Sequence, residues 1–468
     1  MVKIKKGDIL EGIEITDITS EGMSIARNDG FVVFVERGVP GDIVDVEVYR
    51  NKKNFAEAKI LNIQKKSSHR IQPICEHFGV CGGCKWQHMR YDQQLHHKQK
   101  HVEEALRRIG KIEFPPVSPI LGSAKTEYYR NRLDFTFSNK RWLTKEEKAA
   151  DVSAEENILG FHVPQRFDKI LAIKKCYLQD DFSNEIRNEI SRFANENNFE
   201  FNDVVTQTGF LRNLIIRSTS TGEWMVIVVF RSDEKEQRDK LLNHVAKKFP
   251  GITSLLYIIN PKKNDTIFDL DVHLFSGKSS IKEVMEGLKF SISAKSFYQT
   301  NSAQAYELYK VVRSFAELKG TELVYDLYTG TGTIASFVSQ NAKHVIGIDY
   351  IEAAIKDATQ NAQDNNISNV SFFSGDIKDT LNDSFINEHG RPDVIITDPP
   401  RSGMHEDVVK KVLDIAPERI VYVSCNPSTQ ARDISLLDEK YKVEKLQPVD
   451  MFPHTTHVEN VALLVRRD

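Results

Sequence analysis

The first 62 residues alternate apolar and polar side chains in short runs that turn-forming residues separate. Strand-like runs and turns occur at Asp8–Gly12, Asn28–Gly30, Gly30–Val35, Pro40–Asp42, Val44–Val48 and Phe55–Ile60. Several short strands in so short a segment are typical of a small closed β-barrel of the OB type. The pattern therefore predicts an N-terminal barrel.

The middle of the chain, residues 63–288, mixes strand and helix patterns. A helix is predicted over Gln93–Ile109, and strands are predicted over Leu211–Ser218 and Trp224–Phe230. We expect a central α+β domain here. A helix near residues 91–126 is expected to pack on the domain that follows.

From residue 289 onward, strand and helix patterns alternate. The predicted strands are Glu322–Leu327, His344–Asp349, Val370–Phe373, Val394–Asp398 and Ile420–Ser424. Helical spacers between most of them are typical of a doubly wound, Rossmann-like parallel sheet. The whole chain is thus predicted to be a multidomain α/β protein with domains at 1–62, 63–288 and 289–468.

Composition supports several domains and a soluble protein. The chain has 468 residues, which is more than one ordinary core holds, and its residues are 40% hydrophobic and 28% charged. The charged start at Met1–Asp8 has no apolar stretch behind it, so no signal peptide is expected. Apolar runs such as Trp224–Phe230 are too short for a bilayer. We expect a cytoplasmic monomer without a membrane partner.

The distribution of charge is more informative than its sum, since the net charge is only −3. Residues 63–114 hold ten Lys and Arg against five acids, with six histidines and the rings of Phe78, Trp86 and Tyr91 among them. Such a stretch suits phosphate contacts and base stacking, although a solvated helix face would look the same. Residues 1–62 hold nine basic and eleven acidic residues, so any binding of nucleic acid by the barrel must use local surfaces such as Arg50–Lys53.

A glycine-rich loop, Gly330–Ala335, joins a predicted strand to a helix in the pattern G-x-G-x-x-A. Glycines allow a tight turn and let a ligand approach the backbone. Asp349 ends the next strand, where a carboxylate can bind ribose hydroxyls. A dinucleotide site would share this fingerprint. With Asp326 before the loop and Asp376 after the third strand, however, the pattern resembles class I methyltransferases, which use S-adenosylmethionine.

Two further strand ends carry chemistry. The fourth predicted strand leads into Thr397-Asp-Pro-Pro-Arg-Ser-Gly403 and the fifth into Val423-Ser-Cys-Asn-Pro-Ser-Thr429. Both ends open on the mouth where ligands lie in such sheets. Asp-Pro-Pro alone also suits methyltransferases of amino nitrogens, and a cysteine at a strand end is usually inert. A helix that starts after Cys425 would stabilise a thiolate there.

A cysteine and a carboxylate at one site fit methylation of uracil at carbon 5. That carbon is a poor nucleophile until a thiolate adds to carbon 6, and a base must later remove its proton. Glu459 opens the apolar run Val461–Val465, where partial burial would raise its pKa toward a useful value. The plainer interpretation is an exposed structural glutamate.

Four motifs together carry a resemblance to the RNA uracil-5-methyltransferases: Ser296–Asn301, Thr397–Gly403, Val423–Thr429 and Met451–Leu464. The resemblance spans essentially the whole chain, and residues 1–62 resemble a TRAM domain. It implies Cys425 as nucleophile and Glu459 as base. The predicted contacts with S-adenosylmethionine are Gln299, Tyr328, Gly330, Asp349, Asp376 and Asp398. Two positions depart from the commonest pattern, because Asp349 replaces a frequent Glu and Thr456 a frequent Gly.

The other four cysteines form a set of potential metal ligands. Cys75, Cys81 and Cys84 lie close together, and Cys176 joins from a distance. Four thiolates can hold tetrahedral zinc or an iron–sulfur cluster. The resemblance implies a [4Fe–4S] cluster with a structural or RNA-positioning role, and zinc is the alternative. Cys425 is then left as the free thiol.

The sequence therefore predicts an enzyme that transfers a methyl group from S-adenosylmethionine to carbon 5 of a uridine in 23S rRNA. This target follows from the resemblance to the ribosomal-RNA branch, which carries the TRAM domain and the four cysteines. The alternatives are a tRNA uridine methyltransferase and an RNA-binding assembly factor whose methyltransferase is vestigial.

Overall fold

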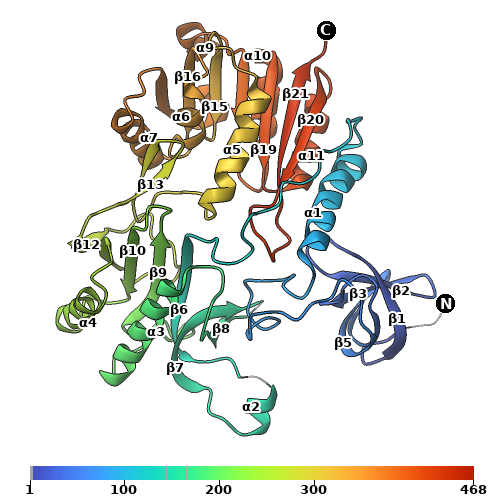
Figure 1. Ribbon diagram of the computed structural model, residues 1–468, viewed down its shortest axis with the longest axis vertical. Helices are drawn as coiled ribbons and strands as arrows, with labels where there is room; N and C mark the ends of the chain where they lie inside the picture. The colour runs from blue at the N-terminus through green and yellow to red at the C-terminus, as the bar shows by residue number, and fades with distance from the viewer. Residues whose placement is uncertain (1–3, 144, 165) are drawn as a thin grey trace.

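The computed structural model describes residues 4–143, 145–164 and 166–468. Figure 1 shows a small barrel near the N-terminus, a central domain, and a C-terminal domain that ends the chain. Helix α1 (Tyr91–Ala105) lies between the barrel and the C-terminal domain. Within the described residues, no helix combines the length and apolar character that a membrane crossing needs.

The predicted barrel is confirmed. Its strands are β1 (Ile9–Ile18), β2 (Ser24–Asn28), β3 (Phe31–Glu36), β4 (Ile43–Asn51) and β5 (Phe55–Lys65), closed in the order β1-β2-β3-β5-β4. Asp29 and Gly30 join β2 to β3 with φ of 49° and 83°. Two left-handed residues make the tight turn that suits the twist of a hairpin. Alternate residues such as Val33 and Val35 are fully buried inside.

The central domain is built on a mixed sheet in the order β12-β11-β10-β9-β6-β7-β8. Its elements are β6 (Arg132–Lys140), α2 (Lys145–Ala149), β7 (Glu155–Val163), β8 (Arg166–Ala172), α3 (Asp181–Glu196), β9 (Leu211–Ser218), β10 (Trp224–Phe230), α4 (Lys235–Lys248), β11 (Ser254–Ile259) and β12 (His273–Gly277). In β10, Val226 and Val228 pack under α3 and α4, whereas Met225 and Ile227 join the core of the C-terminal domain. The sheet is therefore buried on both faces at this strand.

The C-terminal sheet has the order β17-β16-β15-β18-β19-β21-β20, and its first five strands in that order are parallel. Its strands are β15 (Leu323–Leu327), β16 (His344–Asp349), β17 (Val370–Ser374), β18 (Val394–Thr397), β19 (Arg419–Ser424), β20 (Tyr441–Val449) and β21 (Glu459–Arg466). The predicted doubly wound sheet is confirmed. β21 runs antiparallel to both β19 and β20.

Helices cover both faces of this sheet, which explains its nearly continuous apolar strands. They are α5 (Ser302–Ala316), α6 (Thr333–Ser339), α7 (Glu352–Asp364), α8 (Ile377–Thr380), α9 (Asp383–His389), α10 (Glu406–Ile415) and α11 (Pro427–Leu437). Val421 of β19 packs on one face, and its neighbours Ile420 and Tyr422 pack on the other. A hairpin of β13 (Ile281–Met285) and β14 (Leu288–Ile292) joins this domain to the central one.

Helix α1 differs from its predicted form at its end. It continues into a π-helical turn, η1 (Leu106–Gly110), and Lys111 then takes a left-handed conformation with φ of 51°. Val102 and Leu106 are buried in the core of the C-terminal domain, under α10 and α11. α1 is thus part of the packing of a domain that begins almost two hundred residues later in the chain.

Candidate active site and four-cysteine cavity

The register of three neighbouring strands brings the predicted catalytic residues to one edge of the sheet. Thr397 of β18 pairs with Tyr422 of β19, and Ser424 of β19 pairs with Asn460 of β21. Cys425 directly follows Ser424, and Glu459 directly precedes Asn460. Because β19 and β21 are antiparallel neighbours, the thiol and the carboxylate lie next to each other where the two strands meet.

The two carboxylates at this edge resist ionisation. Glu459 is only 5% exposed, and burial raises its pKa to about 8, with a further contribution from the charge of Asp398. Burial also raises the pKa of Asp398 to about 7. A carboxyl group with a pKa near neutrality can both release and accept a proton at the pH of a cell.

The thiol of Cys425 does not show the stabilised thiolate that the helix start predicts. Asn426 caps α11 by accepting a hydrogen bond from the Ser428 N–H at 3.1 Å, so the helix N-terminus does lie beside the thiol. Burial nevertheless raises the pKa of Cys425 to about 11, and the charge of Glu459 adds to this shift. Desolvation is thus the main cause of the raised pKa, and the carboxylates of Glu459 and Asp398 act in the same direction.

Arg401 counteracts this repulsion and was missed by the sequence analysis. Its side chain makes a hydrogen bond with Cys425, and its charge lowers the pKa of the Cys425 thiol. Its carbonyl oxygen accepts hydrogen bonds from Asn426 Nδ2 at 3.0 Å and Thr429 Oγ1 at 3.2 Å. Arg401 stands three residues after Asp398 in the Thr397–Gly403 motif. A positive charge so close to a predicted site residue is the signal in the sequence that could have identified it.

The glycine loop has the features of a ligand cradle. A Cβ atom at Gly330 would meet nothing within 4 Å, so the space above the loop is open. Asp349 Oδ2 accepts a hydrogen bond from the Gly330 N–H at 2.9 Å, which ties the end of β16 to the loop. Asp326 Oδ2 accepts from Thr329 Oγ1, and burial raises the pKa of the Asp326 carboxyl group to about 7. These residues fit a polar ligand such as S-adenosylmethionine.

The remaining predicted cofactor residues surround this loop less directly. Tyr328 lies between the end of β15 and the loop and has φ of 63°. The segment with Gln299 lies over the loop, since the Phe297 carbonyl accepts a hydrogen bond from Thr331 Oγ1 at 3.4 Å. Asp376 is exposed and caps α8 by accepting from the Lys378 N–H at 3.2 Å. Its predicted contact with the cofactor stays a prediction.

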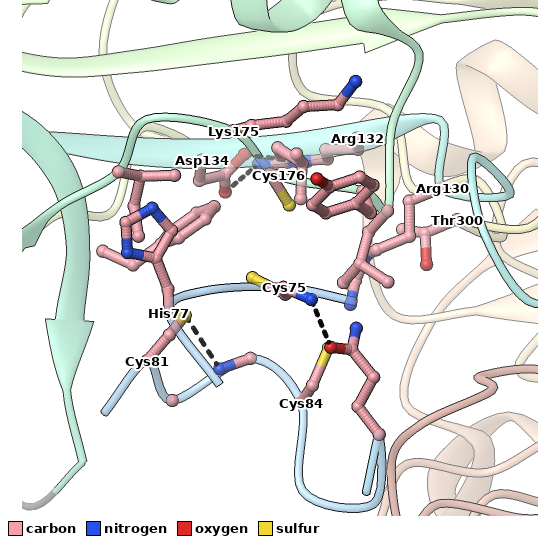
Figure 2. Close-up of a pocket in the computed structure, with 18 of the residues that line it drawn as sticks. Cys75, His77, Cys81, Cys84, Arg130, Arg132, Asp134, Lys175, Cys176 and Thr300 are labelled. Atoms are coloured by element: carbon pink, nitrogen blue, oxygen red, sulfur yellow. Dashed lines mark hydrogen bonds and ion pairs between the residues drawn. The ribbon is translucent and has the colours of Figure 1, made fainter. Parts of the chain in front are cut away.

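Cys75, Cys81, Cys84 and Cys176 line one cavity of about 590 Å³. Figure 2 shows the four side chains around this common space. Three come from the loop before α1, and Cys176 comes from the segment between β8 and α3. The Lys174 N–H donates a hydrogen bond to His77 Nε2 at 2.9 Å and so joins the two segments. The structure thus places Cys176 in one cavity with the other three cysteines, and their role as metal ligands stays a prediction.

The cavity disfavours four free thiolates. Burial raises the pKa of Cys81 to about 11, and the neighbouring Cys176 and Cys75 raise it further. Within the described parts of the chain, no three His, Cys, Asp or Glu side chains are arranged to hold a single metal ion. Burial and the other three thiols likewise raise the pKa of Cys84, so ionisation of all four together is unfavourable.

The cysteine loop and α1 together hold the segment that leads into Glu459. The Lys85 and Trp86 N–H groups donate to the His454 carbonyl at 2.8 and 2.9 Å. Lys98 Nζ lies 2.6 Å from Asp450 Oδ1 and donates to the Phe452 carbonyl at 3.0 Å. Nothing in the local sequence pattern marks Lys98 as a buried lysine, so this ion pair could not be predicted.

Comparison with known proteins gives two family matches. The family described as tRNA (Uracil-5-)-methyltransferase matches residues 216–467, and the TRAM domain matches residues 6–61. An RNA methyltransferase of Bacteroides thetaiotaomicron, described as uncharacterized, is 60% identical over 454 residues, which cover 96% of this chain and 100% of the relative. A relative from Chlorobaculum tepidum with the same description is 37% identical over 476 residues, which cover 100% and 98%.

Among solved structures, the chain is similar to the Pyrococcus abyssi tRNA (uracil-54, C5)-methyltransferase in complex with S-adenosyl-L-homocysteine. The identity is 29% and the TM-score is 0.76. The match covers 97% of this chain and 100% of that protein, so the similarity extends across the barrel, the central domain and the C-terminal domain.

Proposed function

The chain belongs to the RNA uracil-5-methyltransferase family, whose members depend on S-adenosylmethionine, and on this premise we propose that it methylates carbon 5 of a uridine in 23S rRNA with Cys425 as nucleophile. The observation that carries the mechanism is the pairing of Ser424 with Asn460, which sets Cys425 beside Glu459. Asp398 lies at the same edge and adds a second carboxylate.

In the proposed reaction, Cys425 Sγ forms a bond to carbon 6 of the uracil, and carbon 5 gains the electron density that it otherwise lacks. S-adenosylmethionine, when bound, supplies an electrophilic methyl group for carbon 5. Glu459 then takes the proton from carbon 5, and the bond between carbon 6 and Sγ breaks with its electron pair returning to sulfur. Arg401 stabilises the thiolate at both ends of this cycle.

The residues that would hold S-adenosylmethionine are Gln299, Tyr328, Gly330, Asp349, Asp376 and Asp398. The open space at Gly330 supports this assignment. Asp349 ends β16 at the position where an acid binds ribose hydroxyls in such folds.

For the four-cysteine cavity we propose a [4Fe–4S] cluster with a structural role. The shared cavity of Cys75, Cys81, Cys84 and Cys176 supports it, as does the need to neutralise crowded thiolates. Protein purified without oxygen should be brown and carry about four irons per chain. Colourless protein loaded with zinc would reject the cluster.

Transfer RNA is the second candidate substrate, because the family description and the Pyrococcus abyssi structure both name tRNA. The TRAM domain combined with the four cysteines favours ribosomal RNA through the resemblance to that branch. Mapping of 5-methyluridine in both RNAs from cells that lack the gene separates the two. A deficit confined to tRNA would overturn the ribosomal target, and no deficit in either would favour an assembly factor.

The nucleophile is tested with RNA that contains 5-fluorouridine in place of uridine. Fluorine cannot leave as a proton does, so the enzyme should remain covalently attached and migrate as an adduct under denaturing conditions. Cys425→Ala should form no adduct. Glu459→Gln serves as the matched control, because it keeps the thiol and should still form one. An equal amount of adduct from Cys425→Ala would sink the assignment.

A further inference from the structure

A second hollow, of about 660 Å³, lies where the barrel meets α1 and shares no lining residue with the four-cysteine cavity. One wall is the side of α1 that carries Gln93, His96, His97 and Lys100. The other wall is formed by the barrel, including Asp17 and the segment Lys65–His69 that follows β5. Figure 1 shows the barrel beside the lower end of α1.

The α1 wall is polar although it faces another element of the protein. Its residues are spaced by three and four positions, so they form one stripe along the helix. The opposite side of α1 carries Gln94 and Lys98, which pack against the segment before Glu459. A helix side that faces a neighbouring element ordinarily carries apolar residues. A polar stripe beside a hollow therefore points to a polar ligand.

The hollow has a surplus of positive charge. Lys65 and Lys66 are exposed, and neither ammonium group makes a hydrogen bond or ion pair with the described residues. Asp17 is the single acid in the lining as far as the structure describes it, and it is already paired with Lys100 at 2.6 Å. His97 Nδ1 lies 3.8 Å from Asp17 Oδ1, whereas the buried Nδ1 atom of His69 has no hydrogen-bond partner within the described residues.

The lysine segment is held in place before any ligand arrives. Asp42 is fully buried and accepts hydrogen bonds from the Ser67 N–H at 2.9 Å and from Arg70 Nε at 3.1 Å. Ser67 Oγ donates to the Pro40 carbonyl at 2.6 Å. Donors that are already ordered lose less conformational entropy on binding.

From these observations we propose that the hollow binds a backbone phosphate of the RNA substrate. The inference rests on the proposed function only in taking RNA as the substrate. Phosphate contacts from Lys and Arg supply affinity and fix the register of the RNA without reading its sequence. A phosphate at Lys65 and Lys66 would lie on one side of α1, and the segment that leads into Glu459 lies on the other side. The same helix would therefore contact both the phosphate-binding hollow and the segment that positions the proposed base.

The barrel surface that the sequence favoured, Arg50–Lys53, lies at the opposite end of β5 from Lys65. Arg50 there is paired with Glu57 at 2.9 Å, which offsets part of its charge. The side chains of Lys247 and Lys248, at the end of α4, are adjacent, exposed and without a hydrogen bond or ion pair to the described residues, as those of Lys65 and Lys66 are. They provide a matched control for charge.

The test is RNA binding across a salt series, followed by fluorescence anisotropy with a fluorescein-labelled, U-rich single-stranded RNA. In the double variant Lys65→Gln/Lys66→Gln, each lost phosphate contact should make the slope of log affinity against log salt less steep by about 0.7. For each tenfold lowering of salt, the affinity of the variant relative to that of the wild type should then fall about fivefold. Lys247→Gln/Lys248→Gln should keep the wild-type slope. Equal slopes in all three proteins, or equal losses in both variants, would overturn the proposal.

A variant of opposite sign strengthens the test. Asp17→Asn removes the acid of the lining and frees Lys100, so RNA should bind more tightly and with a steeper salt dependence. Weaker or unchanged binding in a folded Asp17→Asn protein would contradict the proposal.

Inorganic phosphate is titrated separately. If it binds in the hollow while the RNA slopes do not move, the site takes free phosphate and the RNA assignment fails. These binding measurements do not depend on methyl transfer. A protein that lacks methyltransferase activity would contradict the proposed function, whereas the salt dependence of RNA binding would still test the phosphate site in the hollow.

Discussion

The ammonium group of Lys98 lies 2.6 Å from the carboxylate of Asp450, and neither side chain is exposed. Tyr91 donates a further hydrogen bond to the same carboxylate at 2.8 Å. Helix α1 is thereby fixed to the residues just before Glu459, although the two segments are far apart in the chain. The position of the proposed base thus depends on an element outside the doubly wound sheet.

Replacing Lys98 by methionine should destabilise the protein strongly. The substitution leaves Asp450 buried without its cation, and breaking such a pair costs about 3 to 5 kcal/mol in the free energy of unfolding. Urea denaturation measures the loss. Lys356→Met, which breaks the exposed pair with Glu352, should leave stability nearly unchanged. If the double variant Lys98→Met/Asp450→Leu is no more stable than Lys98→Met, the ion pair is not the cause.

Methyl transfer should become faster as the pH rises through 8. Burial raises the pKa of Glu459 to about 8, so its carboxylate form, which can accept a proton, is the minor form at neutral pH and the major form above pH 8. The Cys425 thiolate also increases with pH, because burial raises that pKa to about 11. The measurement is kcat/KM against pH. A profile that falls between pH 7 and 9 would exclude Glu459 as the base.

The reactivity of Cys425 should respond in opposite directions to its two charged neighbours. Glu459→Gln removes a negative charge, lowers the pKa of the thiol and should speed alkylation by iodoacetamide at pH 8. Arg401→Gln removes the positive charge and should slow it. Mass spectrometry of the peptide with Cys425 gives the rate at this one thiol. Shifts of the same sign in both variants would contradict the electrostatic account.

Alanine in place of each of the two loop glycines should impair the protein in a different way. At Gly332, with φ of 72°, a Cβ atom would lie 2.7 Å from the Phe372 ring, so Gly332→Ala should lower stability by about 1 to 3 kcal/mol. At Gly330 a Cβ atom meets only open space, so Gly330→Ala should cost less stability and mainly weaken S-adenosylmethionine binding. Thermal melting and calorimetric titration separate the two effects, and reversed effects would place the ligand elsewhere.

Local patterns were sufficient to predict most of the C-terminal sheet. His344–Asp349 is a strand over the residues predicted, because a buried strand between helices is a short apolar run with sharp ends. β2 (Ser24–Asn28) was missed, since its five residues include serine, arginine and asparagine and give little alternation. The Asn28–Gly30 turn was predicted because left-handed turn residues are a local requirement.

The arrangement of the site could be predicted only in part. Strand ends predicted that Asp398 and Cys425 share one edge, since this follows from the topology of the fold. The direction of the Cys425 pKa shift could not be predicted, because it depends on burial and on Glu459, which approaches from another strand. The contact of Lys98 with Asp450 likewise joins segments 352 positions apart, and no local pattern encodes it.

The pairing of Ser424 with Asn460 also separates the mutations that this enzyme can tolerate from those that it cannot. The chain between Cys425 and Glu459 runs through α11 and β20. Extra residues in the turn that joins α11 to β20 would leave both reacting groups in place. Loss of a single residue at the start of β21 would instead shift every later side chain to the other face of the sheet. Length can therefore drift in that turn over generations, while the short step from Glu459 to Asn460 cannot change.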